Sequence, residues 1–212
     1  VSGEAAKYLG KNPEDLKIVT CHLGNGSSIT AVNGGKCIDT TMGFTPLAGV
    51  LMGTRSGDID ASAVEFLAKK KGLSHSEVIT YLNKECGVAG ISGVSSDFRD
   101  LIKGAKKGNA RCALALDMFA YQTKKFIGAY AAAMGGLDCI VFTAGIGENT
   151  PKVREDVCKG LEFLGVKFSS KANKAPNDGS IREISKSNSK VKVLIIPTNE
   201  ELVIARETAA LL

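Results

Sequence analysis

A buried strand that runs into a glycine turn and then into a second strand places the strongest constraint on the fold of this chain. The apolar run Ile18–Cys21 favours an extended, buried backbone. The turn Gly24-Asn25-Gly26 follows, and its glycines permit positive φ and the close approach of another group. The chain is extended again over 28–33, and Asn33-Gly34-Gly35 predicts a hairpin into a third strand at 36–41. We therefore expect three consecutive antiparallel strands.

The glycine turn differs from the two common nucleotide-binding loops. P-loops and dinucleotide-binding fingerprints need a strand, a glycine-rich loop and a helix in that order, whereas this turn lies between two strands. The N–H groups and hydroxyls at a hairpin tip can still hold phosphate oxygens, and Ser27 and Ser28 supply hydroxyls. A plain tight hairpin is the alternative interpretation.

The charge balance and the cysteines exclude some classes of function. The chain has 27 Lys and Arg against 22 Asp and Glu, so its net charge is +5. This charge is compatible with a phosphate ligand but too diffuse for a nucleic-acid surface. We expect no membrane association, because no apolar run approaches the length of a spanning helix. The 6 cysteines include no C-x-x-C pair, which predicts buried free thiols in the reducing cytoplasm.

The segment from Thr41 to Asp60 fits neither helix nor strand and contains a single arginine, Arg55. A long irregular loop in a compact domain is usually either functional or disordered, and this one is too apolar for disorder. The sequence Gly53-Thr54-Arg55-Ser56-Gly57 holds the arginine by backbone on both sides, as a fork that binds an oxyanion or a phosphate needs. A surface arginine in a structural loop is the alternative.

Helical patterns follow this loop. We expect a helix with an apolar face from Asp58 to Gly72, a second helix that begins with the capping box Ser74–Glu77, and a loop over 87–93. A further helix begins near Asp97, and apolar residues at alternating steps of four and three predict the longest helix over 109–134.

Three side chains in this part of the sequence have chemical potential. His75 falls in the first turn of a predicted helix, where we expect it to be solvated, so His22 is the better candidate for chemistry. Asp97 is interpreted as a carboxylate at a helix start, which the helix dipole favours. A ligand contact is the alternative interpretation of Asp97.

The stretch from Cys139 to Thr150 repeats the theme of strand and glycine turn. The continuous apolar run Cys139–Thr143 predicts a central strand buried on both faces. We expect Ala144–Thr150 to be a tight loop before a helix that has Pro151 in its first turn. N–H groups at such a helix start suit an anion or the close approach of a planar ring. A plain turn between strand and helix is the alternative.

The end of the chain completes the predicted fold. Val191–Ile196 predicts another buried strand, and Thr198 opens the last helix in a capping box with Glu201. Glu200 is not needed for that cap, so its carboxylate is available to bind a cation at the ends of the strands. Together these elements predict an α/β domain with a mixed five-stranded sheet flanked by helices, and with its glycine loops gathered at one edge. Ile181–Ile184 is a candidate for one more edge strand.

Four motifs in this sequence also resemble the signatures of the acetate kinase family. They occur in order along nearly the whole chain as His22-Leu23-Gly24-Asn25-Gly26, Met52-Gly53-Thr54-Arg55-Ser56-Gly57-Asp58, Phe142-Thr143-Ala144-Gly145-Ile146-Gly147-Glu148-Asn149 and Pro197-Thr198-Asn199-Glu200-Glu201. The family belongs to the actin, Hsp70 and sugar-kinase superfamily, so the resemblance implies a ribonuclease-H-like core. It also implies a homodimer that transfers the γ-phosphoryl group of ATP reversibly to acetate, giving acetyl phosphate and ADP, with Mg²⁺ or Mn²⁺.

The resemblance further implies roles for individual residues. Arg55 resembles the arginine that stabilises the transferring group, and Glu200 resembles the magnesium carboxylate. The residues that resemble nucleotide contacts are His22, Leu23, Gly24, Asn25, Gly26, Asp97, Phe98, Arg99, Gly145, Ile146, Gly147, Glu148 and Asn149. These roles are physically reasonable, because the transferred group has a spread negative charge and catalysis depends on positioning and charge neutralisation.

The chain also departs from the family pattern. Ala48 and Ala61 stand where many members have Glu and Pro, although neither change removes a charge assigned to the chemistry. Nothing in the sequence matches the family's Asn-Ala-Gly-Ser-Ser-Ser-x-Lys motif. We therefore expect residues 1–212 to be the C-terminal nucleotide-binding domain alone, without the N-terminal domain and inactive by itself. The alternatives are a kinase of propionate or butyrate, and an actin-like nucleotide-binding module without catalysis.

Overall fold

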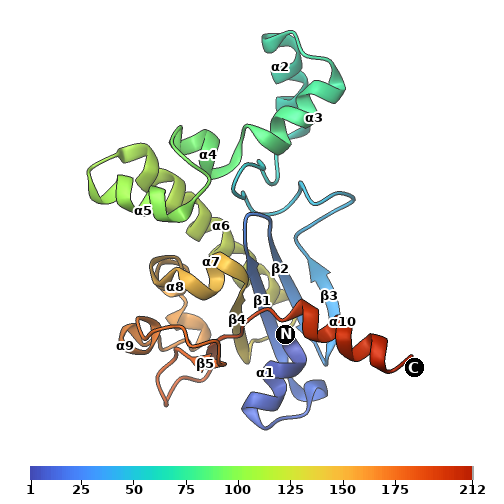
Figure 1. Cartoon of the computed structure of the whole chain (residues 1–212), viewed down its shortest axis with the longest axis vertical. Helices are drawn as coiled ribbons and strands as arrows, with labels where there is room; N and C mark the ends of the chain where they lie inside the picture. Colours follow the sequence, from blue (N-terminus) through green and yellow to red (C-terminus); the bar gives the residue numbers. More distant parts are fainter. Residues whose placement is uncertain (212) are drawn as a thin grey trace.

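One mixed sheet organises the molecule (Figure 1). The computed structural model describes residues 1–211, without the side chains of Glu200 and Leu202. The strand order is β3-β2-β1-β4-β6-β5, and the strands are β1 Lys17–Leu23, β2 Ser27–Asn33, β3 Lys36–Thr40, β4 Cys139–Thr143, β5 Arg182–Glu183 and β6 Lys192–Ile195. Strands β1, β2 and β3 are antiparallel neighbours, whereas β1, β4 and β6 run parallel.

The sheet confirms the predicted α/β class and the antiparallel start, and it corrects the number of strands. The sheet has 6 strands, because Arg182 and Glu183 pair with the outer edge of β6. This pairing lies in the Ile181–Ile184 stretch that was a candidate edge strand. A two-residue strand carries too short an alternation to be distinguished from a polar loop.

The helices are α1 Ser2–Leu9, α2 Ala61–Lys71, α3 His75–Lys84, α4 Gly87–Ser92, α5 Phe98–Lys106, α6 Ala110–Ala133, α7 Ala144–Asn149, α8 Pro151–Cys158, α9 Ser170–Asn173 and α10 Glu200–Ala209. Two predicted loops were wrong, because 87–93 contains α4 and 144–150 contains α7. Glycines at both segments favour a loop by composition, but contacts with neighbouring segments hold both as short helices. In α4, the N–H groups of Val88 and Ala89 donate to the carbonyls of Met52 and Gly53.

The long helix α6 confirms the prediction over 109–134 and supplies the main core. The Asn109 side chain caps it by accepting from the N–H groups of Arg111 and Cys112. Phe119 and Ile127 on α6 are fully buried in one cluster with Ile140 and Phe142 of β4. A second cluster, which includes Ala5 and Ala6 of α1 together with Cys139 and Val141, covers the other face of the sheet. Strand β4 is therefore buried on both faces, as predicted.

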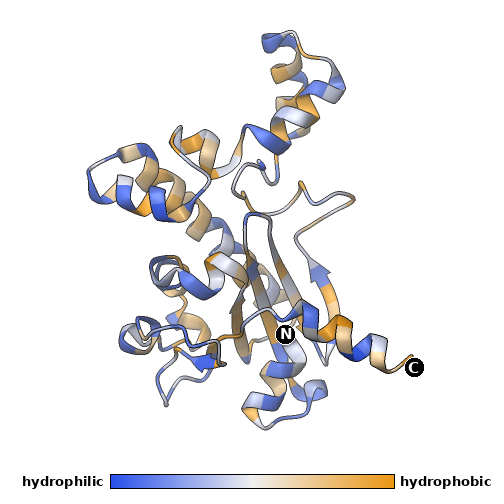
Figure 2. Ribbon diagram, in the orientation of Figure 1, coloured by the Kyte–Doolittle hydropathy of each residue, from blue (hydrophilic) through white to orange (hydrophobic). Residues whose placement is uncertain are grey.

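The α2–α3 pair projects from the body of the molecule (Figure 1). The capping box of Ser74 and Glu77 is formed, and His75 is exposed, as predicted. The apolar face of α2 is largely uncovered, because Phe66 is 60% exposed and none of the residues of α2 is buried. In Figure 2, apolar residues are interspersed with polar residues along α2 and α3. The spacing of apolar residues correctly predicts that a helix has an apolar face. It does not predict whether another element covers that face.

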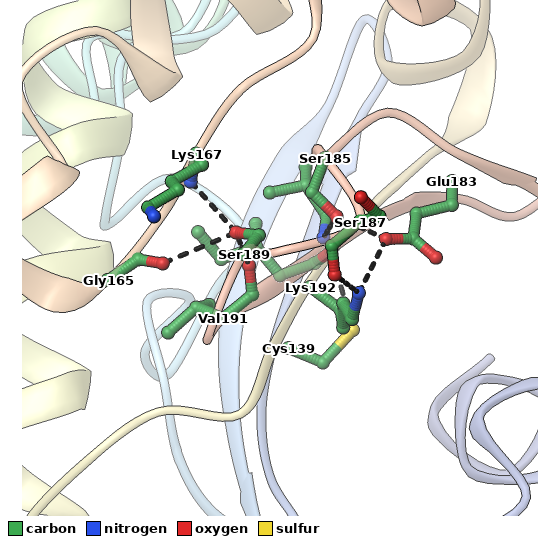
Figure 3. Close-up of polar contacts among 11 residues, drawn as sticks. Cys139, Gly165, Lys167, Glu183, Ser185, Ser187, Ser189, Val191 and Lys192 are labelled. Carbon is green, nitrogen blue, oxygen red and sulfur yellow. Dashed lines mark hydrogen bonds and ion pairs between the residues drawn. The ribbon is translucent and has the colours of Figure 1, made fainter.

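The segment between α8 and β6 is held by a partly buried polar network (Figure 3). The Ser189 hydroxyl accepts from the Lys167 N–H at 2.8 Å and donates to the Val191 carbonyl at 2.6 Å. The Lys192 ammonium donates to Glu183 at 3.0 Å and to the Ser187 carbonyl at 3.2 Å. These bonds lie at the amino end of β6, away from the strand ends that carry the predicted motifs, so we interpret the network as structural.

Most of the cysteines are buried free thiols, as predicted. Cys21, Cys112, Cys139 and Cys158 are buried free thiols, whereas Cys86 is half-buried and Cys37 is exposed. Burial raises the pKa of the Cys21 thiol well above its usual value. Within residues 1–211, none of the helices combines the length and apolar character that crossing a membrane needs.

The irregular segment from Thr41 to Asp60 is confirmed, and its path depends on tight backbone packing at Gly57. Gly57 has φ +71°, and an added Cβ would lie 2.5 Å from the Gly49 oxygen and 2.6 Å from the Val50 carbonyl carbon. Both atoms belong to the backbone and cannot rotate away. We expect Gly57→Ala to lower the free energy of unfolding by more than about 3 kcal/mol, from strain and overlap together.

Gly72 is the matched control for this prediction. It has a similar φ of +64°, but nothing lies within 4 Å of an added Cβ. Gly72→Ala should therefore cost only the conformational penalty, about 1 kcal/mol. Urea unfolding of the two variants checks the prediction, and equal losses would contradict the packing argument.

Candidate functional site

A pocket of about 510 Å³ at the carboxyl ends of β1 and β4 joins three stretches that are far apart in the sequence. We call it the upper pocket. The hairpin tip after β1, the start of α5, and α7 with the residue that follows it all line this pocket. Its lining residues are Gly24, Asn25, Ser96, Asp97, Phe98, Arg99, Gly145, Ile146, Asn149 and Thr150.

A neighbouring pocket of about 540 Å³, the lower pocket, has a different character. Gly145 lines both pockets, so the two are adjacent. The lower pocket is lined by the side chains or backbone of His22, Ala144, Gly145, Glu148, Thr198, Asn199 and Glu201. A histidine and two carboxylates give it cation-binding groups, whereas the upper pocket combines the apolar residues Phe98 and Ile146 with polar and charged residues and glycines.

The start of α5 is fixed by Asp97, which caps the helix. Its carboxylate accepts from the Arg99 N–H at 2.8 Å and pairs with the Arg99 guanidinium at 2.5 Å. Hydrogen bonds from the Arg99 side chain and backbone lower the pKa of Asp97. The cap interpretation of Asp97 is thus confirmed, and the same residue also lines the upper pocket.

Phe98 anchors the wall of the upper pocket beside Asp97. Its ring is 3% exposed and packs edge-to-face on Phe119 of α6, with the centroids 4.8 Å apart. The ring is therefore held by the core and not free to rotate out of the wall.

Thr198 ties the end of β6 to α7. Its hydroxyl accepts from the Ala144 N–H at 3.0 Å and lies 2.7 Å from the Thr143 hydroxyl. The Glu148 carboxylate accepts from the Thr198 N–H at 2.9 Å. Ala144 has φ +63° within this arrangement, which is unusual for a residue other than glycine. Such backbone strain persists only where surrounding contacts enforce it.

These bonds correct the predicted capping box at the last helix. Helix α10 begins at Glu200, and the Thr198 hydroxyl is directed to β4 and α7 and not to the helix start. Glu201, which the capping box was expected to explain, lines the lower pocket. The predicted magnesium ligand, Glu200, has its side chain outside the described residues.

Arg55 lies beside the hairpin tip. An added Cβ on Gly26 would be 3.1 Å from one terminal nitrogen of the Arg55 guanidinium, so Gly26 permits this close approach. The same nitrogen donates to the Pro46 carbonyl at 3.1 Å and contacts the Met52 sulfur at 3.7 Å. Among the ion pairs of the described residues, none includes Arg55.

Not every predicted contact residue reaches the pockets. The Leu23 side chain is fully buried in the core. Gly147 is buried as well, and an added Cβ would meet the Phe142 carbonyl carbon at 3.4 Å and the Cys21 oxygen at 3.6 Å. Gly147 therefore allows α7 to pack closely on β1 and β4. His22 and Glu148 line the lower pocket and not the upper one.

Sequence reasoning missed Ser96, Thr150, Thr198 and Asn199 as lining residues. Ser96 and Thr150 are adjacent to predicted contact residues, and Thr198 and Asn199 lie within the last matched motif, so proximity along the chain was the available signal. It also missed Arg154, which is 1% exposed. An arginine inside an amphipathic helix is normally solvated, so the sequence carries no signal for its burial.

Comparison with known proteins gives consistent results. Residues 1–206 match the acetokinase family. The chain is 57% identical over 208 residues to the acetate kinase of Heliobacterium modesticaldum, which covers 98% of this chain and 52% of that relative. It is also 57% identical over 211 residues to the acetate kinase of Treponema denticola, covering 100% of this chain and 53% of that relative.

Solved structures agree with the sequence relatives. A crystal structure of Porphyromonas gingivalis acetate kinase is similar with a TM-score of 0.95 and 46% identity, covering 99% of this chain and 52% of that chain. A propionate kinase from Francisella tularensis is similar with a TM-score of 0.88 and 40% identity, covering 97% of this chain and 52% of that chain.

The chain thus spans about half the length of the relatives it matches. The fold that the resemblance implied, that of the actin, Hsp70 and sugar-kinase superfamily, is confirmed. On the match over residues 1–206, the chain belongs to the acetokinase family.

Proposed function

We propose that this chain is the nucleotide-binding half of a kinase that transfers the γ-phosphoryl group of ATP reversibly to acetate, giving acetyl phosphate and ADP. One observation carries the proposal: three motifs distant in sequence line a single pocket of about 510 Å³ beside Arg55. Family membership supports the reaction class. The N-terminal half of the relatives would supply the remaining groups.

The order of residues along the site suggests how the nucleotide lies. Ile146 provides apolar surface for the base at one end of the upper pocket, and the buried Phe98 supports the wall there. Gly24 and Asn25 lie at the hairpin tip, where backbone N–H groups suit phosphate oxygens. Arg55 comes next, beside Gly26. A nucleotide in this direction extends its last phosphate toward the Arg55 guanidinium.

The chemistry of the step follows from the charges on this path. A phosphoryl group in transfer carries spread negative charge, which a planar guanidinium fork stabilises by paired hydrogen bonds. Arg55 is suited to this role, because it has no ion-pair partner among the described residues. His22 and Glu148 line the adjoining lower pocket, next to the phosphate end.

The residues of the lower pocket fit a magnesium ion shared with the nucleotide. Mg²⁺ prefers oxygen ligands and is usually held by one or two carboxylates together with substrate phosphates. Glu148 and Glu201 line the pocket, and among the described side chains, which do not include Glu200, no group of three or more His, Cys, Asp or Glu could hold a metal by itself. When bound, Mg²⁺ neutralises phosphate charge. We retain Glu200 as the proposed metal carboxylate, and Mn²⁺ as a substitute ion.

A pair of variants separates the two adjacent glutamates. We expect Mg²⁺ to tighten ADP binding by the chain, and Glu200→Gln to remove most of that gain, by about tenfold, because a metal ligand is lost. Glu201→Gln should leave the gain intact. Calorimetric titration with and without Mg²⁺ measures both, and the opposite pattern would assign the metal to Glu201, which lines the lower pocket.

A propionate kinase is the second candidate function, favoured by the 40% identical Francisella tularensis structure. The full-length protein should be assayed for acyl phosphate formation with acetate, propionate and butyrate at equal concentration. We expect the highest kcat/KM with acetate. A preference for a longer acid would change the substrate, and no activity with any of the three would support the non-catalytic alternative.

We also propose that the protein is a cytoplasmic homodimer that associates through this half. Helix α6 carries an apolar stripe at steps of four and three, where Leu114 is 51%, Met118 36% and Tyr121 68% exposed. Contiguous exposed apolar surface of this kind is typical of interfaces. Sedimentation velocity at micromolar concentration checks the dimer, and a monomer alone would count against it.

A further inference from the structure

Arg154 on α8 is a buried cation whose hydrogen-bond acceptors are all neutral. It is 1% exposed and donates to the Asn173 side chain at 2.7 Å and to the Asn173 carbonyl at 3.0 Å. One terminal nitrogen donates to the carbonyls of Gly147 and Glu148, at 2.8 Å and 2.9 Å. Among the ion pairs of the described side chains, none includes Arg154.

The charge on Arg154 is therefore unusual in its surroundings. Burial, assisted by the nearby Arg182, lowers its pKa to about 10, so it is still protonated at neutral pH. A buried charge without a counter-ion is costly unless its donors are satisfied. Here carbonyl and amide oxygens satisfy them, which makes the position of each acceptor depend on the guanidinium.

Two of those acceptors belong to the C-terminal end of α7. The last carbonyls of a helix have no partner within the helix, and a helix of 6 residues such as α7 is too short to be stable without external contacts. Arg154 supplies such contacts from α8. Asn173 of α9 completes the arrangement, since its side-chain amide donates to the Pro151 carbonyl at 2.9 Å.

Helix α7 in turn forms the wall between the two pockets. Gly145, Ile146 and Asn149 line the upper pocket, and Glu148 lines the lower pocket. The other end of α7 is held by Thr198 through the Ala144 N–H. The helix is thus fastened at its start from β6 and at its end by Arg154. A shift at either end moves the pocket wall.

We propose that Arg154 is a positioning residue that sets nucleotide affinity by fixing the end of α7. The inference rests on the proposed nucleotide-binding function. Arg154 does not line either pocket, so it acts through Gly147 and Glu148 and not by contact with a ligand. Its effect falls mainly on the part of the nucleotide that α7 faces. The hairpin tip has bonds of its own, from the Gly24 N–H to the Gly26 carbonyl and from the Gly53 N–H to the Asn25 carbonyl.

The test compares Arg154→Met, Arg154→Lys and the control Val157→Ala in the chain itself, by calorimetric titration with ADP, adenosine and pyrophosphate. Methionine keeps an unbranched side chain without donors, and lysine keeps the charge without the fork. Val157 lies on the same helix and is fully buried, so its truncation lowers stability without removing a bond to α7. All titrations are made at a temperature where each variant is folded.

We expect Arg154→Met to weaken ADP and adenosine about tenfold and Arg154→Lys about threefold, with pyrophosphate affinity unchanged. Val157→Ala should change none of the three affinities by more than about twofold, whatever its loss of thermal stability. Wild-type adenosine affinity in Arg154→Lys would overturn the proposal. So would a parallel loss of pyrophosphate affinity, or an equal effect of Val157→Ala.

Hydrogen exchange tests the positioning role of Arg154 without relying on nucleotide binding, so the two proposals can fail independently. Without any nucleotide, the amides of 144–149 should exchange faster in Arg154→Lys than in the wild type, whereas those of α6 should not change. Unchanged exchange in 144–149 would overturn the positioning role. If the wild type binds no nucleotide, the proposed function fails, and the exchange result still decides whether Arg154 fixes α7.

Discussion

Replacing Arg55 by alanine in the full-length protein should lower kcat for acetyl phosphate formation by about 10³-fold or more, while ADP affinity changes by less than about threefold. Arginines that stabilise a transferring phosphoryl group have effects of this size, because they act on charge that spreads in the transition state. Arg55 is placed for such a role, because it lies beside Gly26 in the hairpin tip whose Gly24 and Asn25 line the upper pocket. It does not line that pocket, so ground-state binding should depend on it little.

Arg55→Lys should recover only part of the rate. Lysine keeps the positive charge but has a single ammonium, which cannot donate two parallel hydrogen bonds to a phosphoryl group. The existing bond from Arg55 to the Pro46 carbonyl, 3.1 Å long, also requires a check that the loop keeps its structure. Thermal unfolding of the variants provides it, because a displaced loop would lower the melting temperature.

Arg99→Ala is the matched control for this prediction. Arg99 is also an arginine of the site, but it is exposed, pairs with Asp97 and lines the upper pocket. Its loss should raise KM for ATP and leave kcat within about threefold, as expected when uniform binding is removed. Steady-state kinetics of both variants separates the roles. A kcat for Arg55→Ala within tenfold of the wild type would contradict the assignment.

The sheet and the long helix were predictable because their signals are local and long. Ile18–Cys21 and Cys139–Thr143 are continuous apolar runs, and α6 repeats its apolar face over 24 residues. Hydrophobic periodicity over such lengths determines the element with little help from the rest of the molecule. The antiparallel start of the sheet followed from the turn residues Asn33-Gly34-Gly35 in the same way.

The short helices were not predictable, because contacts distant in sequence stabilise them. Helix α7 is six residues that include two glycines, and its carbonyls are bonded to Arg154. Nothing local to 144–149 signals that partner. The capping box at Thr198 failed for a related reason, since its hydroxyl is bonded to Thr143 at the end of β4 and to Ala144 at the start of α7. Tertiary hydrogen bonds overrode a local motif that was otherwise complete.

The sequence predicted many of the residues of the candidate site, but not how they are arranged in space. Periodicity and turn chemistry located the glycine turns, and the resemblance to the family selected Asp97–Arg99 and Gly145–Asn149. That these stretches line one pocket depends on the strand order, which places β1 beside β4. Leu23 and Gly147 show the limit of a motif: both are in the matched segments, yet their places in the structure are in the core.

The isolated chain should bind ADP and still fail to transfer a phosphoryl group. Three stretches of this chain line the upper pocket, and contacts from backbone N–H groups are fixed by the local fold. Transfer needs more than binding, because the acyl carboxylate must be held in line and shielded from water. The chain spans about half the length of its relatives, and we propose that the other half provides these functions.

Calorimetric titration of the purified chain with ADP and Mg²⁺ tests the central claim most directly. We predict saturable binding of one ADP per chain with a dissociation constant below about 1 mM, together with no acetyl phosphate formation from ATP and acetate by the same sample. The absence of ADP binding at millimolar concentration would contradict the assignment of the upper pocket. Turnover near that of a full-length kinase would contradict the claim that this chain is the nucleotide-binding half.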